Sequence, residues 1–259
     1  MGRMRSPDLS GREFLKDTVR LRVDFSRTAQ NRGLPPPPIE KPCPAGALRT
    51  ALAPPGRWKG IAPVELSAAI AARRSRRSFS SAPLSLDELS FLLWAAQGMT
   101  ELLAPGTARR TVPSAGCRHA LETYVCALRV RGLEEGIHRY LPLEHELCLE
   151  RRVDGLPRRL AEAALGQGFL ARAAAVLVWT AVPARMEWRY GEASYKVIAL
   201  DAGHVCQNLY LACAAVGAGT CAVAAYRQDL LDGLLGVDGG EEFAVYLAPV
   251  GKVGGAAEG

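Results

Sequence analysis

The strongest hydrophobic pattern lies in the second half of the chain. Residues 174–182 (AAVLVWTAV) form a continuous apolar run with the length and branching of a buried central strand. Residues 183–216 then carry the longest helical pattern, which Gly191 could interrupt, with apolar positions spaced by four and three at Ile198, Ala202, Val205, Leu209, Ala212 and Val216. A second apolar set lies off that seam, at Leu200, Tyr210, Leu211 and Ala214. This pattern predicts a core helix that also meets a partner subunit.

Shorter patterns predict the other elements. We expect helices over residues 11–33, 62–72, 86–96, 157–165 and 228–235. We expect strands over 122–130, 137–141, 146–149, 220–226 and 243–252, and a long loop over 99–120. Ser85 followed by Glu88 has the spacing of a capping box. Because helices and strands mix without strict alternation, the sequence predicts an α+β fold with a sheet flanked by helices.

The N-terminal part differs in composition from the rest. Gly33 is soon followed by four consecutive prolines, which force extended backbone, and more prolines follow before residue 60. We therefore expect residues 1–60 to form an N-terminal helix and a proline-rich arm that packs on the domain or on a partner subunit. Residues 61–259 would form the main domain.

Composition limits the classes of function. At 259 residues and 49% hydrophobic, the chain can bury a large core. The net charge of +6 comes from 32 basic residues spread among 26 acidic ones, and aromatics are only 7%, which disfavours a nucleic-acid surface. No apolar run of about 18 residues is free of charge, and the N-terminus lacks the apolar middle of a secretion signal. We expect a cytoplasmic protein without a membrane anchor.

Cysteine and histidine spacings give no sign of a metal site. The seven cysteines contain no CxxC pair and are odd in number, so neither a metal cluster nor a disulfide framework is expected. The four histidines show no HxxxH or HExxH spacing. His204 shares a helix face with Asp201 and Asn208, which favours a buried polar network over a catalytic role.

A basic heptapeptide, RRSRRSF at residues 73–79, is the clearest candidate binding segment. Four guanidiniums and two serine hydroxyls suit the oxygens of a phosphate. Three interpretations are open from these residues alone: a solvated basic turn, a nucleic-acid patch, or a pocket for a phosphorylated cofactor.

Several ordered motifs share a family pattern. They are RRSRRSF at 73–79, PLSLDELSFLLWAAQG at 83–98, PSAG at 113–116, GIHRY at 136–140, LDAGHVCQNLYLA at 200–212 and YLAPVGK at 246–252. Together they resemble the FMN-dependent nitroreductase-like flavoproteins, and most closely the subgroup of SagB-type dehydrogenases and azoline (thiazoline/oxazoline) oxidases. The resemblance implies a nitroreductase-like FMN-binding domain over 61–259, with a central, mainly antiparallel sheet and a long core and dimer helix. It also implies a homodimer.

The resemblance assigns residues to a flavin site. The cofactor-binding candidates are Arg73, Arg74, Ser75, Arg77, Pro113, Ser114, Ala115, Gly116, Ala224, Ala225 and Lys252. The PSAG segment would approach the flavin from the opposite subunit, and Lys252 would close on the phosphate. Arg76 falls between the matched positions and is expected to point outward. Ala224 and Ala225 stand where some relatives have glutamate and glycine, so only backbone groups would face the flavin there.

Catalytic residues are harder to assign. Azoline oxidases of this subgroup carry a Lys-Tyr pair in the region where this chain has Arg189-Tyr190, and Tyr195-Lys196 supplies the same types in reverse order. We take Tyr190, Arg189 and Lys196 as the catalytic candidates; the alternative is that both pairs are polar edges of a helix. Arginine stays protonated, which weakens the assignment to azoline oxidation.

The function implied by the resemblance is hydride transfer through bound FMN, with NAD(P)H as donor and a small-molecule or peptide substrate. Two alternatives remain: an azoline dehydrogenase in ribosomal-peptide maturation, and a flavin-binding protein without turnover.

Overall fold

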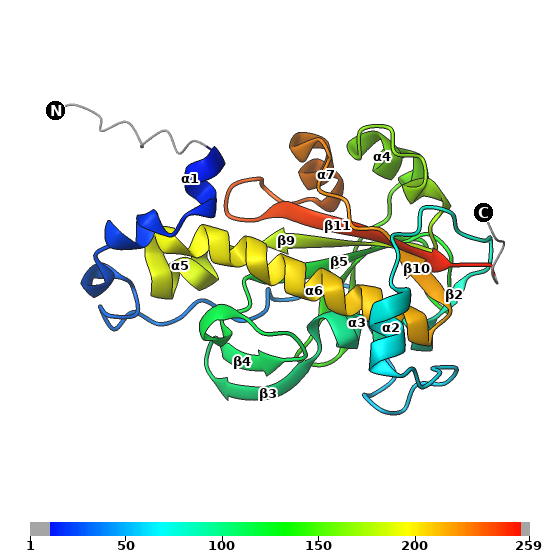
Figure 1. Cartoon of the computed structure of the whole chain (residues 1–259), viewed down its shortest axis with the longest axis horizontal. Helices are drawn as coiled ribbons and strands as arrows, with labels where there is room; N and C mark the ends of the chain where they lie inside the picture. The colour runs from blue at the N-terminus through cyan, green and yellow to red at the C-terminus, as the bar shows by residue number, and fades with distance from the viewer. Residues whose placement is uncertain (1–10, 255–259) are drawn as a thin grey trace.

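A seven-stranded antiparallel sheet forms the centre of the computed structural model, which describes residues 11–254 (Figure 1). Its order is β1 (Arg49–Ala51), β8 (Glu146–Arg151), β7 (Gly136–Leu141), β5 (Leu121–Ala127), β9 (Ala175–Ala181), β11 (Phe243–Lys252) and β10 (Ala218–Thr220). Every residue of β9 is buried, and the strand lies between β5 and β11. The predicted α+β class, with a buried central strand in an antiparallel sheet, is confirmed.

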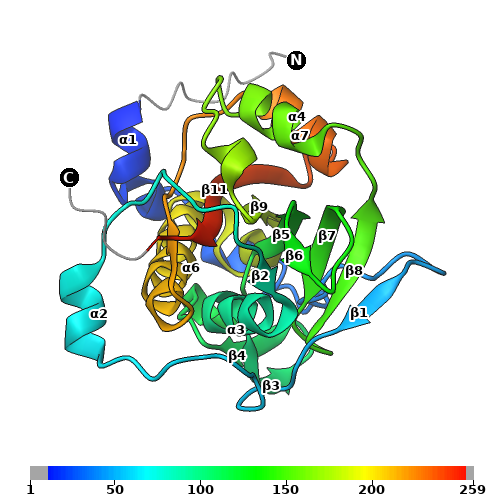
Figure 2. The same cartoon turned by 90° about the vertical axis from the view of Figure 1, so that its right-hand side faces the viewer.

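Helices cover both faces of the sheet (Figures 1 and 2). One face carries α3 (Leu86–Gln97), α5 (Ala184–Tyr190) and the long α6 (Tyr195–Ala215), with α2 (Leu66–Ala72) beside α6. The other face carries α4 (Leu156–Ala163) and α7 (Gln228–Leu235). Each face has its own hydrophobic core, so α6 is fixed against the sheet by one side only.

Two local predictions in this layer are confirmed. Ser85 and Glu88 make both bonds of a capping box at the start of α3. Gly191, at φ 53°, separates α5 from α6, and a 3-10 turn, η5 (Gly191–Ser194), joins them. Glycine reaches this backbone conformation without the steric cost that a side chain would add.

The helix predicted over residues 11–33 is wrong. This segment forms three short pieces, α1 (Gly11–Leu15), η1 (Thr18–Leu21) and η2 (Phe25–Arg27). Asp24 explains the last break, because its side chain accepts a hydrogen bond from the Ser26 amide and starts a new turn. Leu21 is 90% exposed, so no apolar face stabilises a continuous helix here.

The loop predicted over residues 99–120 is also wrong in its first half. Residues 99–110 form a hairpin of β3 (Met99–Ala104) and β4 (Thr107–Arg110), joined at Pro105-Gly106, where Gly106 has φ 68°. Most of β3 is exposed, so it lacks the apolar alternation that reveals a buried strand. A 3-10 turn, η3 (Ala115–Cys117), then contains the last two residues of the PSAG segment. The remaining pair of strands, β2 (Leu84–Ser85) and β6 (Val130–Arg131), is parallel.

The predicted strand over residues 220–226 ends at Thr220. Beyond it only Val223 makes an isolated bridge, to Leu247. The reason is that the Ala222 amide donates to the Tyr210 hydroxyl at 2.8 Å instead of to a neighbouring strand. This departure from the sheet opens the edge next to α6.

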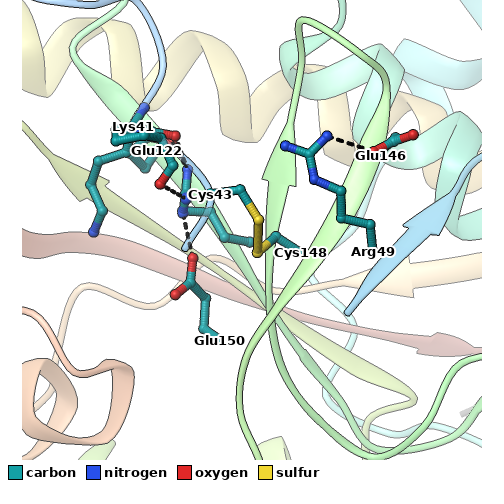
Figure 3. The surroundings of a disulfide bond; sticks show 9 residues. Lys41, Cys43, Arg49, Glu122, Glu146, Cys148 and Glu150 are labelled. Carbon is teal, nitrogen blue, oxygen red and sulfur yellow. Dashed lines mark hydrogen bonds and ion pairs between the residues drawn. A yellow bond between two sulfur atoms is a disulfide. The ribbon is translucent and has the colours of Figure 1, made fainter. Parts of the chain in front are cut away.

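A disulfide joins the N-terminal arm to the sheet, contrary to the expectation that none is present. Cys43 and Cys148 are bonded, at a sequence separation of 105 (Figure 3). The buried Arg139 brings the arm there, because its guanidinium donates to the carbonyl oxygens of Lys41 and Pro42. Spacing along the chain could not reveal a pairing that depends on this long-range contact.

Buried charges extend the same attachment. The Lys41 ammonium contacts Glu242 at 2.5 Å, and Glu242 also accepts from Tyr124 and Thr180. Glu122 pairs with Arg185 and lies 3.6 Å from Arg139. The Lys41 amide also donates to Glu122 at 2.8 Å, so both carboxylates contact residue 41 and attach it to the sheet.

Glu40 gives the arm a pH-dependent stability. Burial raises the pKa of its carboxyl from 4.5 to about 7, although the Leu143 amide donates to it. Between these two pH values the folded chain keeps a proton that the unfolded chain releases, so the free energy of unfolding should fall as pH rises through this window. Glu40→Gln stays neutral, and we expect it to be more stable than wild type by about 1 kcal/mol at pH 8 but not at pH 4. Urea unfolding at both pH values measures this, and an equal gain at pH 4 would contradict it.

Candidate functional site

The basic heptapeptide runs along the edge of the sheet at β10. The Arg76 amide donates to the Thr220 carbonyl at 2.9 Å, and Ser75 forms a bridge with Thr220. The segment lines a cavity of about 580 Å³ whose walls are Ser75, Arg76, Arg77, Ser78, Phe79, Ser80, Val253 and Gly254. We call this the cationic cavity.

The guanidiniums of this segment lack acidic partners. None of the four forms an ion pair with a carboxylate in the described part of the chain. Arg74 instead donates to the backbone carbonyls of Ala71 and Arg73. Uncompensated positive charge with two nearby hydroxyls fits an anionic group with several oxygens, such as a phosphate.

Tyr210 of α6 connects the heptapeptide to the segment after β10. Its hydroxyl lies 3.0 Å from the Ser75 hydroxyl and accepts from the Ala222 amide. The Arg73 guanidinium lies 5.5 Å from the centre of the Tyr210 ring. The sequence placed Tyr210 in the second apolar set of this helix, but nothing in that pattern showed that its hydroxyl joins two segments of the site.

A second cavity, of about 540 Å³, lies along α6 toward its N-terminal end. Its lining is almost entirely apolar, with Phe14, Ala181, Tyr195, Ile198, Ala199, Ala202, Gly203, Ala224, Phe243, Val245 and Tyr246. We call this the apolar cavity. Gly203 and Tyr210 are seven residues apart on α6, which is about two turns and about 10 Å, so they lie on one side of the helix; Tyr210 reaches the cationic cavity through its contact with Ser75.

Small side chains shape the apolar cavity. Ala199, Ala202 and Gly203 let a ligand approach the α6 backbone closely. Ala224 lines the cavity, while Ala225 is exposed and its carbonyl accepts from Gln167. A flat, largely apolar ring joined to an anionic tail would match this pair of cavities.

The PSAG segment, Pro113–Gly116 in sequence, lies against a different part of the chain. Gly116 has φ 58°, and a Cβ atom there would come within 2.7 Å of the Tyr190 hydroxyl and about 3.0 Å of the Arg189 side chain. The segment therefore packs directly on the Arg189-Tyr190 pair, so two of the three catalytic candidates form one cluster with it. Ser114 accepts a hydrogen bond from the His119 amide.

Asp201 anchors this cluster on α6. The buried Asp201 carboxyl borders one small cavity with Pro113 and Ser114; burial raises its pKa, and Ser114, His204 and the Ala115 amide oppose the rise. His204 is half exposed, 3.9 Å from Asp201, and Asn208 donates to the Ala95 and Thr111 carbonyls. The predicted shared network of Asp201, His204 and Asn208 is therefore divided between separate partners.

The two halves of the predicted site lie on opposite sides of α6. Asp201, which lies beside the PSAG segment, and Tyr210, whose hydroxyl contacts Ser75 of the heptapeptide, are nine residues apart. Nine residues turn a helix by about 180° and advance it by about 13 Å. Within one chain, the PSAG segment cannot cover the cavities on the Tyr210 side.

Lys252 and Lys196 occupy positions apart from both cavities. The Lys252 ammonium contacts Glu88 at 2.5 Å and the Val216 carbonyl at 2.6 Å, which ties β11 to α3 and the end of α6. A phosphate contact from Lys252 would require it to leave this pair. Lys196 is half-buried on α6 and lines neither cavity. The Arg189 guanidinium lies 5.6 Å from the centre of the Tyr190 ring.

No helix within residues 11–254 is long and apolar enough to cross a membrane. In the same range, no group of three or more His, Cys, Asp and Glu side chains is arranged to hold a metal ion.

Comparison with known proteins agrees with this geometry. The pattern of the nitroreductase family matches residues 70–252. A protein of Methanocaldococcus jannaschii with a nitroreductase name, MJ1384, is 37% identical over 194 residues, which cover 74% of this chain and 93% of the archaeal protein. A crystal structure of a Ralstonia eutropha JMP134 protein, also named as a nitroreductase, superimposes with a TM-score of 0.66 at 28% identity, covering 86% of this chain and 100% of that one. The trifolitoxin-processing protein TfxB of Rhizobium leguminosarum bv. trifolii is 29% identical over 60% of this chain and 44% of its own length.

Proposed function

Because this chain belongs to the nitroreductase family, we propose that it is an FMN-dependent oxidoreductase that works as a homodimer with NAD(P)H as electron donor. The observation that carries this proposal is the apolar cavity on α6 together with the cationic cavity that Tyr210 of α6 reaches through Ser75. When bound, FMN would supply the hydride chemistry, and the protein would hold and orient the reactants.

The chain has suitable groups for each part of the cofactor. Arg73, Ser75 and Arg77 would hold the phosphate, since charge-assisted bonds to phosphate oxygens are strong, and Arg74 lies beside them. The backbone at Ala224 and Ala225 would border the ring, and the small residues of the apolar cavity would admit it. Lys252 would add positive charge at the phosphate end only after release from Glu88.

A homodimer would complete the site. Since the PSAG segment and the heptapeptide of one chain lie on opposite sides of α6, the PSAG segment of a second copy would cover the first copy's flavin. α6 exposes Leu200, and Leu211, three turns later on the same side, lines an apolar groove with the exposed Val64 and Leu66 near α2. Unpartnered apolar surface of this kind favours a protein interface.

The catalytic candidates would act within that dimer. Tyr190 and Arg189 pack on the PSAG segment, so they would reach the flavin of the other subunit together with it. The Tyr190 hydroxyl could hold or pass a proton, whereas Arg189 stays protonated and could only bind and orient substrate. A role for Lys196 would likewise depend on the second subunit.

The absorption spectrum of the purified protein tests the proposal. We expect flavin bands, with FMN as the compound released on denaturation, and bleaching by NADH or NADPH under anaerobic conditions. A colourless protein that takes up no FMN on reconstitution would overturn the proposal. Bound FMN that no donor reduces would instead support a flavin-binding protein without turnover.

Tyr210→Phe should weaken FMN binding about tenfold. The change removes one hydroxyl that bonds both Ser75 and Ala222, and a hydrogen bond contributes about 1 kcal/mol. Titration of the apoprotein with FMN measures this. Tyr226→Phe is the matched control. It also removes one partly buried hydroxyl, which donates to the Ala244 carbonyl, and neither Tyr226 nor Ala244 lines either cavity. Equal affinities for the two variants would show that Tyr210 does not organise the site.

A second candidate function is azoline oxidation on a ribosomally made peptide. The similarity to TfxB, whose name describes toxin processing, favours it. Arg189 in place of the subgroup's lysine disfavours it, since a guanidinium cannot act as a base. Genes for a cyclodehydratase and a short precursor peptide beside this gene, followed by azole formation on that peptide by the purified protein, would establish it.

A further inference from the structure

Phe14 lines the apolar cavity although it lies far outside the family match. The match begins at residue 70, yet Phe14 of α1 stands with Tyr195, Ala224 and Tyr246 in the cavity wall. The N-terminal segment therefore contributes to a cavity whose other walls come from residues within the family match.

The segment that carries Phe14 is attached next to the cavity. The Gln30 amide donates to the Trp188 carbonyl at 2.8 Å, and the Trp188 indole donates to the Leu34 carbonyl at 2.9 Å. Val23 packs close to Gly191, where α5 ends, and α6 starts four residues later. These contacts attach residues 23–34 to α5 and to the turn before α6. As a result, α1 lies next to the cavity at the N-terminal end of α6.

Phe14 is the residue of α1 that lines the apolar cavity. No residue of α1 is buried, and Phe14 is 41% exposed, so one part of its ring borders the cavity while another meets solvent. The next residue, Leu15, is 68% exposed and does not line the cavity. Glu13 bonds Lys16 and Thr18, which fixes the short helix around Phe14.

The rest of the wall indicates what could bind beside the flavin. No charged side chain lines the apolar cavity, and its polar side-chain groups are the hydroxyls of Tyr195 and Tyr246. Burial raises the pKa of Tyr195 to about 12, with a smaller contribution from Glu187, so this hydroxyl stays neutral near pH 7. Such a wall suits an uncharged, flat ligand that carries one hydrogen-bonding group.

We propose that Phe14 is a specificity-determining residue, whose ring closes the outer side of the apolar cavity and limits the size of the uncharged aromatic ligand that can lie beside the flavin. This inference rests on the proposed function, because it assumes that the substrate binds in the part of the apolar cavity that the flavin ring would leave free. Removal of the ring would lengthen the cavity toward solvent and favour larger ligands.

Binding of two redox-inert amides to the FMN-loaded protein tests this. Benzamide and 2-naphthamide are uncharged and differ by one fused ring, and a change in the flavin absorbance reports their Kd values without turnover. In Phe14→Ala we expect the ratio of the naphthamide affinity to the benzamide affinity to rise about tenfold, the scale of discrimination by an apolar pocket. Phe14→Trp should lower the ratio, and Leu15→Ala should leave it at the wild-type value.

The outcomes separate this inference from the proposed function. A wild-type protein without flavin would overturn both. A flavin-loaded wild type with an unchanged affinity ratio in Phe14→Ala and Phe14→Trp, or with no binding of either amide, would overturn only the role of Phe14. Loss of flavin from Phe14→Ala alone would also overturn it, since the ring would then be a cofactor contact.

Discussion

Arg73→Ala and Arg77→Ala should each weaken FMN binding by about 10- to 100-fold, while Arg76→Ala should stay within about threefold of wild type. A hydrogen bond to a charged group contributes about 1.5–3 kcal/mol, which corresponds to this range. Arg77 lines the cationic cavity together with Arg76, whereas Arg73 is not in its wall and has its guanidinium 5.5 Å from the centre of the Tyr210 ring. None of the three guanidiniums has a competing carboxylate within residues 11–254.

Arg76 is the matched control because it carries the same charge in the same segment; contrary to the expectation that it points outward, it lines the cationic cavity. Its stem packs against Gly219, where a Cβ atom would come within 2.6 Å of it, so much of this side chain is used in packing on β10. FMN titration at two salt concentrations separates a specific phosphate contact from general attraction, which salt screens. If Arg76→Ala lost FMN while Arg73→Ala kept it, the assignment of Arg73 to the phosphate and of Arg76 to packing would be wrong.

The sequence predicted those parts of the fold whose signals are local. The apolar run before Val182 needs no partner to be read as a central strand, and the Ser85–Glu88 box lies within one turn of helix. The failures have long-range causes. Residues 220–226 leave the sheet because Tyr210 takes the Ala222 amide, and Cys43 finds Cys148 because Arg139 binds the arm.

The candidate site shows the same division. The local sequence alone showed the basic residues of the heptapeptide. The PSAG segment was identified from its place in the ordered family motifs. Neither showed that these two segments are fixed to opposite sides of α6, which follows only once Asp201 and Tyr210 have partners. Phe14 could not be assigned either, since a lone aromatic residue in a charged segment gives no sign of the cavity it will reach.

Leu200→Glu should convert the proposed dimer into monomers and remove FMN at the same time. Leu200 belongs to the second apolar set of α6 and is 54% exposed in the single chain, so the folded monomer should lose little stability. In a two-fold dimer the change occurs twice, and each copy would lose a buried leucine, about 1.5–3 kcal/mol, and bury a carboxylate. The dimer dissociation constant should therefore rise by at least 100-fold. Because we propose that the PSAG segment comes from the second copy, flavin binding should be lost together with dimerisation.

Light scattering coupled to gel filtration, with flavin absorbance read on the same peak, measures both effects. Leu165→Glu is the control, since Leu165 is 59% exposed just after α4, on the opposite face of the sheet, and its change should leave a yellow dimer. A Leu200→Glu monomer that retains FMN would place the whole site within one chain, contrary to the opposite anchoring of Ser114 and Ser75 on α6. A Leu200→Glu protein that remains dimeric would show that the subunits meet elsewhere, and the second apolar set of α6 would then need another explanation.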